Sequence, residues 1–417
     1  MTEPAQLITD MGRKARAAFS QLTGVSDAQK STALTAAARH LRASEQNILE
    51  ANQRDMASAR DRDLSDSMLD RLMIDAERLE AIAAAVEHVG KLPDPVGQVI
   101  DRSERPNGLV MERVRVPLGV IGIIYESRPN VTADAAALAL RSGNAVILRG
   151  GSEAIQSNSA IYEAMVAGVV EARLPADAIQ LVQTTDRAAV GAMLKASGLI
   201  DIIIPRGGKS LVKRVQDEAR VPVLAHLDGI CHTYIAKDAD PDKALAIAVN
   251  AKMRRTGICG AMETLLIDQD YPAPGPLVRA LLESGCEIRG DDSVLELDER
   301  VVSADASDWD TEYLAPVLSV GMVDGVDEAL AHIAEHGSHH TDVIVTEDTD
   351  MAERFILRAD SAIVMHNASS QFADGGQFGL GAEIGISTGR LHARGPVALE
   401  GLTTYKWVVR GTGQVRP

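Results

Sequence analysis

The stretch "NAVILRGGSEAIQSNSAIYEAMVAGVVEA", residues 144–172, decides the fold because it joins a β-branched apolar run to an amphipathic segment through two glycines. The apolar run 145–148 predicts a buried strand, and the apolar residues after the glycines recur at helical spacing. The same pattern returns over residues 178–197 and 199–219. Strand, turn and helix in alternation predict a parallel sheet covered by helices.

Further along the chain the alternation resumes, over residues 231–252, 262–267, 315–346 and 361–367. Two α/β domains in series are therefore expected. Toward the N-terminus, residues 4 to about 90 carry apolar residues at three-to-four spacing and predict helix. The segment 91–99 breaks this pattern with two prolines and a glycine, and residues 109–126 then predict an exposed strand that leads into a buried one.

The C-terminal stretch "GLTTYKWVVRGTGQV", residues 401–415, predicts a late strand that contains Trp407. If this strand pairs with the early strand "MERVRV", residues 111–116, the two form an arm suited to dimerisation. A plain edge strand is the alternative.

Composition limits the function classes. With 42 basic and 59 acidic residues the net charge is −17, which argues against a nucleic-acid partner. No apolar run approaches the roughly 18 residues that a membrane span needs, and the N-terminus has no apolar signal-peptide core. Three cysteines, Cys231, Cys259 and Cys286, cannot all pair and favour a reducing compartment. A cytoplasmic protein without membrane or nucleic-acid partners is expected.

Two glycine pairs stand between a buried strand and a helix, where glycine lets backbone approach a ligand and helix N–H groups bind an anion. Each alone also fits an ordinary strand–helix turn, but both together favour a dinucleotide. An arginine after the strand favours NADPH over NADH, although Glu153 is an opposing acidic residue. A third glycine-rich stretch, "GLGAEIG" (379–385), has no strand before it and predicts a loop near the active site. The candidate cofactor-binding residues in the two turns are Arg149, Gly150, Gly151, Ser152, Gly207, Gly208, Lys209 and Ser210.

In "RRTGICGAMETLLI", residues 254–267, Cys259 is either a buried filler thiol or a nucleophile. Nearby cations raise the thiolate fraction of a cysteine, and Lys252, Arg254 and Arg255 are candidates to do so or to bind a substrate phosphate. The histidines of "EHGSHH", His336, His339 and His340, raise the alternative of a metal site. The cluster ends a predicted helix before a strand and contains none of the cysteines of a strong zinc motif, so a substrate-contacting or structural loop without metal is favoured.

Three blocks carry a family resemblance: "YESRPNVTADAAALALRSGNAVILRGG", "NAKMRRTGICGAMETLL" and "DGGQFGLGAEIGISTGRLHARGPVALEGLTTYKW". Together they resemble the γ-glutamyl phosphate reductase branch of the aldehyde dehydrogenase superfamily, over nearly the whole chain. The resemblance implies two Rossmann-like parallel-sheet domains and an oligomerisation arm, in a homodimer or homotetramer. The expected parts are an NADP-binding domain (1–101 and 120–228), a catalytic domain (229–390) and the arm (102–119 and 391–417).

The resemblance also implies residue roles. Cys259 resembles the catalytic thiol, and Asn130 the asparagine that completes the oxyanion hole, although a helix N-cap is its structural alternative. Glu312 resembles the glutamate that bonds the nicotinamide ribose. Lys252, Arg255 and His340 are the expected substrate contacts. Oxidising relatives have a general-base glutamate where this chain reads "HLDGICH", residues 226–232, and the loss of that base fits a reductase.

The implied reaction is the NADPH-dependent reduction of L-glutamyl 5-phosphate to L-glutamate 5-semialdehyde and phosphate, through a thioester on Cys259. This is the second step of proline biosynthesis from glutamate. If glutamate 5-kinase passes on its labile product directly, a transient contact with that kinase follows. Two alternatives stay open: an NAD(P)-dependent oxidoreductase of another aldehyde, and a non-catalytic partner of the kinase.

Overall fold

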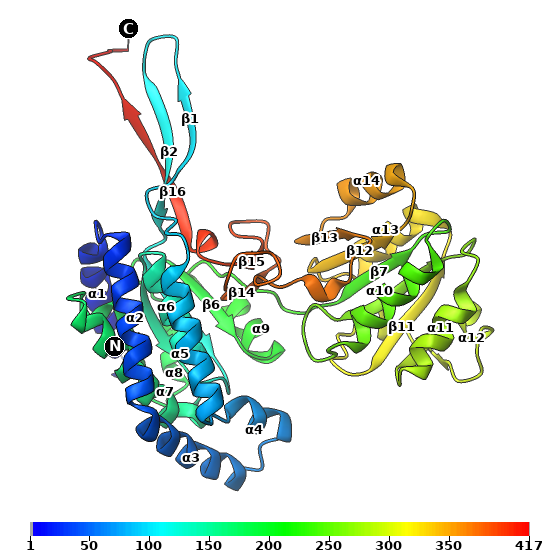
Figure 1. The fold of residues 1–417 in the computed structure, drawn as a ribbon, viewed down its shortest axis with the longest axis horizontal. Helices are drawn as coiled ribbons and strands as arrows, with labels where there is room; N and C mark the ends of the chain where they lie inside the picture. The colour runs from blue at the N-terminus through cyan, green and yellow to red at the C-terminus, as the bar shows by residue number, and fades with distance from the viewer. Residues whose placement is uncertain (1–2, 417) are drawn as a thin grey trace. The chain divides into compact units, whose positions relative to one another are not determined.

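The computed structural model describes residues 3–416 and divides into two compact units, each considered by itself (Figure 1). The first unit comprises Met1–Ala225, Leu380–Gly385 and Val397–Pro417, and the second comprises His226–Gly379 and Ile386–Pro396. Within residues 3–416, no helix is long and apolar enough to span a membrane.

A four-stranded parallel sheet forms the centre of the first unit, in the order β5 (Ile179–Leu181), β4 (Ala145–Arg149), β3 (Val120–Tyr125), β6 (Ile202–Arg206). These strands are almost entirely buried, as expected for parallel strands covered on both faces. The chain alternates between the strands and α6 (Asn130–Arg141), α7 (Ile155–Glu171), α8 (Ala188–Leu194) and α9 (Lys209–Glu218). The predicted strand–turn–helix repeats are confirmed.

The N-terminal segment folds as helices, as predicted, with breaks that the periodicity did not locate. Ser26 begins the second helix with a capping box, in which its hydroxyl accepts from the Gln29 backbone N–H and the Gln29 side chain accepts from the Ser26 N–H. A Cβ on Gly168 would lie 2.2 Å from the backbone nitrogen of Ala37, so glycine allows α7 to pack directly on α2. The helices are α1 (Glu3–Leu22), α2 (Asp27–Ala43), α3 (Glu45–Asp61), α4 (Asp66–Leu72) and α5 (Ala76–Lys91).

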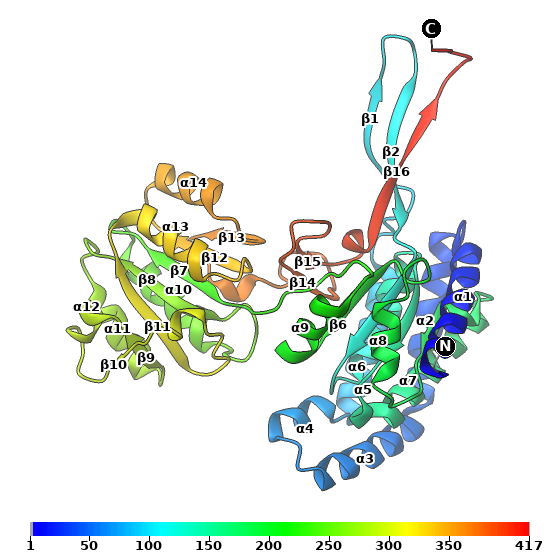
Figure 2. The ribbon, with the colours of Figure 1, turned by 180° about the vertical axis from the view of Figure 1, so that it is seen from behind.

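A three-stranded antiparallel sheet also belongs to the first unit, in the order β1 (Val99–Glu104), β2 (Val110–Pro117), β16 (Thr403–Arg410). Its strands lie side by side in both views (Figures 1 and 2). Trp407 of β16 pairs with Arg113 of β2, so the predicted pairing of the last strand with "MERVRV" is confirmed.

The second unit contains a seven-stranded sheet whose neighbours are all parallel. Leu265 packs into the apolar cluster on one face and Leu266 into that on the other, because successive side chains of a strand alternate. The order is β10 (Val302–Ser303), β9 (Glu287–Gly290), β11 (Val317–Val323), β8 (Met262–Asp268), β7 (Cys231–Ile235), β12 (Thr341–Val345), β13 (Ile363–His366).

Helices cover both faces of this sheet (Figure 1). One face packs against α10 (Pro241–Met253) and α11 (Pro274–Glu283), and the other against α13 (Gly325–His336) and α14 (Thr349–Arg358). The short helix α12 (Asp292–Leu295) follows β9. The expected fold class, two parallel α/β domains with an additional strand arm, is confirmed. The predicted loop over 379–385 is irregular up to β14 (Gly385–Ser387), which pairs with β15 (Gly395–Val397).

Candidate active site

The amino ends of three neighbouring strands bring the chemically reactive side chains of the second unit together. Cys259 precedes β8, Gly229 precedes β7, and His340 directly precedes β12. Because these strands are parallel and adjacent, their amino ends lie at one edge of the sheet. Cys259 lies 30 residues after Gly229 and 81 residues before His340. The order of the strands in the sheet, and not a local motif, brings the three residues together.

Two histidines flank the thiol of Cys259. The sulfur, one ring nitrogen of His226 and one of His340 all lie within 4.8 Å of one another. The two imidazole rings meet edge to face, with their centroids 5.2 Å apart. Imidazoles are thus the immediate polar neighbours of the sulfur that the structure identifies. The sequence had predicted cations beside the thiol, from Lys252, Arg254 and Arg255, but not these two histidines.

Hydrogen bonds and burial orient both rings. His226 Nδ1 lies 2.8 Å from the carbonyl oxygen of Ile386, so Nδ1 carries the proton and Nε2 carries the lone pair. His340 is fully buried, with its Nδ1 2.9 Å from the hydroxyl of Thr341. Burial, together with the neighbouring His226, lowers the pKa of His340 to about 3. His340 is therefore neutral at physiological pH.

Gly229 and Cys231 contact the loop that carries Cys259, and Glu312 in turn holds Gly229. A Cβ on Gly229 would lie 2.2 Å from the carbonyl oxygen of Cys259, so only glycine permits this approach. Glu312 Oε1 accepts a 2.9 Å hydrogen bond from Gly229 N, and the Cys231 thiol donates to the Cys259 carbonyl at 3.1 Å. Burial raises the pKa of Cys231, which keeps it a donor. The predicted bond of Glu312 to a nicotinamide ribose stays a prediction.

The residues predicted to bind substrate differ in exposure. Lys252 is fully buried and its ammonium pairs with Glu263, whose pKa burial raises to about 7 against the opposing effect of Lys252. This geometry favours a structural role for Lys252. Arg255 is exposed, and its carbonyl accepts a 3.2 Å bond from Gln371, a residue that sequence reasoning did not single out.

The metal alternative for "EHGSHH" does not match the structure. His336 Nδ1 contacts Asp310 at 2.9 Å, whereas His339 Nδ1 contacts the carbonyl of Asp360 at 2.8 Å. Only His340 of the three belongs to a group of metal-capable side chains, and its partners there are Cys259 and His226. No disulfide forms among the three cysteines of residues 3–416.

In the first unit, the two predicted cofactor turns lie at the carboxyl edge of the sheet, after β4 and β6, with β3 between these strands. Gly207, Gly208, Lys209 and Ser210 are exposed where β6 ends and α9 begins. The N–H of Gly208 donates to Glu126 Oε2 at 3.0 Å, so a carboxylate already occupies the anion-binding end of α9. This end of α9 therefore accepts an anionic group, which in the structure is the carboxylate of Glu126.

The turn after β4 presents a second charged group. Gly150, Gly151 and Ser152 follow Arg149, whose guanidinium is largely buried and contacts the Thr185 carbonyl at 3.4 Å. Within residues 3–416 the buried Nε of Arg149 has no hydrogen-bond partner. Burial lowers the pKa of Arg149, while Glu153 opposes that effect. An incompletely satisfied, poorly solvated guanidinium fits an anionic ligand such as a ribose phosphate.

Glu153, the acidic residue that opposed an NADPH assignment, is engaged within the protein. Its Oε1 accepts bonds from the backbone N–H and the hydroxyl of Ser127, at 2.6 and 2.9 Å. Residues Ser152–Ala154 form a short 3-10 helix directly after the glycine pair. The Glu153 carboxylate thus binds Ser127 and holds the loop after β3 in place.

Asn130 is the first residue of α6 and donates from its amide to Asp134 Oδ2 at 2.9 Å. Pro129 occupies the N-cap position, so the N-cap alternative for Asn130 is wrong. Burial raises the pKa of Asp134 to about 6, with Asn130 opposing the shift. The oxyanion role of Asn130 stays a prediction.

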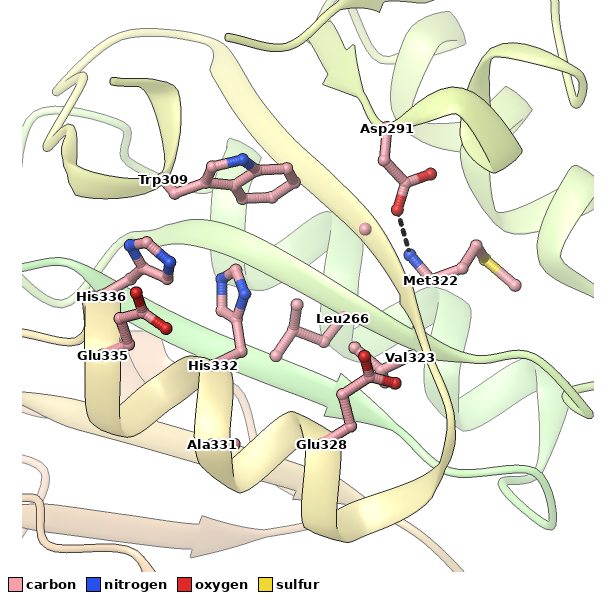
Figure 3. A pocket seen from close by; sticks show the side chains of 11 residues that line it. Leu266, Asp291, Trp309, Met322, Val323, Glu328, Ala331, His332, Glu335 and His336 are labelled. Atoms are coloured by element: carbon pink, nitrogen blue, oxygen red, sulfur yellow. Dashed lines mark hydrogen bonds between the residues drawn. The ribbon is translucent and has the colours of Figure 1, made fainter. Parts of the chain in front are cut away.

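One cavity of about 390 Å³ lies beside α13 in the second unit (Figure 3). Figure 3 shows Trp309 facing His332 and His336 of that helix, and Asp291 Oδ2 accepting a 2.7 Å bond from Met322 N. The lining includes none of Cys259, His226 and His340. The cavity is therefore separate from the candidate active site, which is recognised by the grouping of Cys259, His226 and His340.

Comparison with known proteins identifies the family. Residues 4–285 match the model of the aldehyde dehydrogenase family. The chain is 68% identical to the gamma-glutamyl phosphate reductase of Rhizorhabdus wittichii over 411 residues, 99% of this chain and 96% of that one. The crystal structure of gamma-glutamyl phosphate reductase from Thermotoga maritima matches with a TM-score of 0.96 and 43% identity, over 98% of this chain and 100% of that chain.

A more distant match shows the fold alone. An engineered glycolyl-CoA reductase with bound NADP+ gives a TM-score of 0.67 at 17% identity, over 97% of this chain and 96% of that chain. The high identity over full length to the reductases, by contrast, defines the branch. The chain belongs to the gamma-glutamyl phosphate reductases of the aldehyde dehydrogenase family.

Proposed function

We propose that this enzyme reduces L-glutamyl 5-phosphate to L-glutamate 5-semialdehyde with NADPH, through a thioester on Cys259. Membership of the family makes the chain an oxidoreductase of proline biosynthesis, and the proposal adds the cofactor and the covalent route. The observation that carries it is the thiol of Cys259 beside two imidazoles, in a loop fixed by Gly229 and Cys231.

The first step needs a thiolate, because the thiol itself is a weak nucleophile. His226 is the better proton acceptor of the two imidazoles, since burial leaves His340 with a pKa of about 3. The sulfur then bonds to the acyl carbon, the bond from that carbon to the phosphate oxygen breaks, and inorganic phosphate leaves. The backbone N–H of Cys259 is a donor for the oxyanion that forms in between.

NADPH supplies the hydride that reduces the thioester carbon. The carbon–sulfur bond then breaks, the semialdehyde leaves, and the sulfur recovers its proton from the imidazolium. No side chain of the "HLDGICH" segment is a glutamate able to activate water, which favours reduction over hydrolysis. Arg255, exposed beside the thiol loop in sequence, is the proposed contact for the leaving phosphate.

For the cofactor, the start of α9 with Gly207, Gly208 and Ser210 is proposed to bind the pyrophosphate. Arg149 and Ser152 are proposed to bind the ribose 2′-phosphate that distinguishes NADPH from NADH. The engaged state of Glu153 supports this assignment, because its carboxylate is already bonded to Ser127.

An assay that couples purified enzyme to glutamate, ATP and glutamate 5-kinase tests the reaction, comparing NADPH with NADH. Wild type should prefer NADPH, and Arg149→Ala should lose most of that preference while retaining activity with NADH. An unchanged preference in Arg149→Ala would remove this residue from the cofactor site.

Mass spectrometry tests the covalent route directly. Enzyme mixed with acyl phosphate in the absence of NADPH should carry a glutamyl adduct on the peptide that contains Cys259. Addition of NADPH should remove the adduct and release semialdehyde. Active enzyme that never carries this adduct would exclude the thioester.

The strand arm is proposed to pair with a second copy of the chain. Tyr405, Trp407 and Val409 lie on one face of the edge strand β16 and are each about half exposed, although they are large and apolar. Light scattering on Trp407→Glu should show a smaller particle than wild type. Lys406→Glu, on the opposite face of the same strand, is the matched control.

A further inference from the structure

We propose that His226, Cys259 and His340 form a reversible binding site for Zn²⁺ or a similar borderline-soft divalent cation. The ion would act as an inhibitor and not as a cofactor, because it engages the sulfur that attacks the substrate. The inhibitory part rests on the proposed function, whereas the binding part rests on geometry alone.

The donor set has the size and chemistry of a zinc site. Sulfur and imidazole nitrogen are the ligands that Zn²⁺ prefers, at about 2.3 Å and 2.0–2.1 Å, so tetrahedral donors lie about 3.3–3.6 Å apart. Here the three donor atoms lie within 4.8 Å of one another before any ion is bound. Closing the remaining gap requires side-chain movements of only about 1 Å.

His340 supplies an independent indication. Its Nε2 is buried and, within residues 3–416, has no hydrogen-bond partner, although an unsatisfied buried polar atom is costly. Its Nδ1 is already in contact with Thr341 Oγ1 and with the Cys231 thiol, which leaves Nε2 as the ring nitrogen available to a cation. A cation there would satisfy that atom.

His226 has the second partner that metal-binding histidines usually have. Its Nδ1 lies 2.8 Å from the Ile386 carbonyl, and such a bond fixes the tautomer whose Nε2 can bind a metal. Cys259 is partly exposed, which provides an entry path. Three protein donors leave a fourth coordination position for water, and the thiol releases its proton when the ion binds.

Cobalt(II) tests binding without any assay of activity. Titration of reduced enzyme with Co²⁺ should give one equivalent of thiolate-to-cobalt charge-transfer absorption. Cys259→Ser should abolish this band, and His226→Gln should weaken binding at least tenfold. His339→Gln is the control, because His339 is adjacent in sequence to His340 but its side chain is exposed and bonded to the Asp360 carbonyl.

His340→Gln changes a fully buried residue and its folding must be checked first, so His226→Gln decides the histidine contribution. Co²⁺ binding without a charge-transfer band, or with a band that persists in Cys259→Ser, would overturn the site.

Zinc inhibition separates this proposal from the proposed function. Zn²⁺ should abolish NADPH oxidation with acyl phosphate, acyl phosphate should protect, and EDTA should restore the rate. A band with Co²⁺ in an enzyme that is inactive toward acyl phosphate would refute the function and keep the site. Full activity in saturating Zn²⁺ would refute inhibition.

Discussion

The two candidate sites use opposite edges of their parallel sheets. In the first unit, the turns around Arg149 and Gly207 follow the carboxyl ends of β4 and β6, where ligands of open α/β sheets usually bind. In the second unit, Cys259 and His340 precede the amino ends of β8 and β12. One edge presents the start of a helix, where Gly208 N donates to a carboxylate, and the other presents a thiol beside two imidazoles.

This difference fits the function proposed for each site. Phosphate is bound by helix N-termini, which in an α/β repeat always follow the carboxyl ends of strands. The proposed nucleophile requires fixed side chains instead, and at the amino edge of the second sheet Gly229 and Cys231 hold the loop of Cys259 through close contacts. Changes at the amino edge should therefore affect the chemical step, and changes at the carboxyl edge the affinity for cofactor.

The largest effect is expected for Cys259→Ser. Loss of the nucleophile should lower kcat by about 10⁴-fold or more, because the residual rate comes from binding alone. NADPH oxidation in the coupled assay measures this. Cys286→Ser, in a core position of the same unit, is the control and should retain activity. A rate near wild type in Cys259→Ser would show that the amino edge of the second sheet does not supply the nucleophile.

The second-largest loss of activity is expected for Gly229→Ala. Its Cβ would lie 2.2 Å from the Cys259 carbonyl oxygen, so it must displace the loop that carries the thiol. A shift of about 1 Å at a reacting atom costs about 10²-fold in rate, so kcat should fall while the KM for NADPH stays constant. Gly257→Ala lies in the same loop and its Cβ would meet no atom within 4 Å. Equal losses in both variants would contradict the proposed positioning.

A smaller effect, on affinity, is expected for Gly207→Ala. The added Cβ would lie 2.5 Å from Glu126 Oε2 and 2.8 Å from Leu211 Cδ2, which crowds the start of α9. The KM for NADPH should rise about tenfold, equivalent to about 1.4 kcal/mol, with kcat nearly unchanged. Gly191→Ala in α8, where the nearest neighbour of a Cβ is 3.8 Å away, should leave both constants at wild-type values.

The smallest expected effect concerns stability at a position outside both sites. Burial, with the neighbouring His232 and His336, lowers the pKa of His332 to about 3. Between pH 6.5 and 3 the unfolded chain therefore binds a proton that the folded chain does not, so stability falls as the pH falls. Because His332 is partly exposed, the loss at pH 5.5 should be at most about 1 kcal/mol.

Thermal unfolding of His332→Phe at pH 7.5 and 5.5 measures this effect. The drop in Tm between the two pH values should be smaller in the variant than in wild type, whereas the comparison at pH 7.5 isolates the change in packing. An identical drop in both proteins would show that His332 contributes nothing to acid sensitivity.

Local patterns were sufficient to predict the carboxyl edge. Strand, glycine pair and helix are contiguous in sequence, so the turns at Arg149 and Gly207 could be located without knowing the sheet order. Cys259 could be singled out by family resemblance, but its neighbours could not. His226 and Cys231 come beside it only because β8, β7 and β12 are adjacent in the sheet, and periodicity does not encode strand order.

Burial was the other quantity that the sequence did not provide. Lys252, two residues before Arg254, was an obvious candidate for a phosphate contact, yet helix α10 directs it into the core against Glu263. Asn130 likewise follows a proline in the manner of an N-cap, but it begins α6 itself and bonds Asp134.

The bond from Gly208 N to Glu126 has a kinetic consequence. If the dinucleotide binds at α9 as proposed, it has to displace the Glu126 carboxylate, which carries the same charge, and that carboxylate can return to Gly208 N when the oxidised product leaves. On the proposed function, we therefore expect this internal competitor to weaken binding of the dinucleotide and to speed its release at the end of each catalytic cycle.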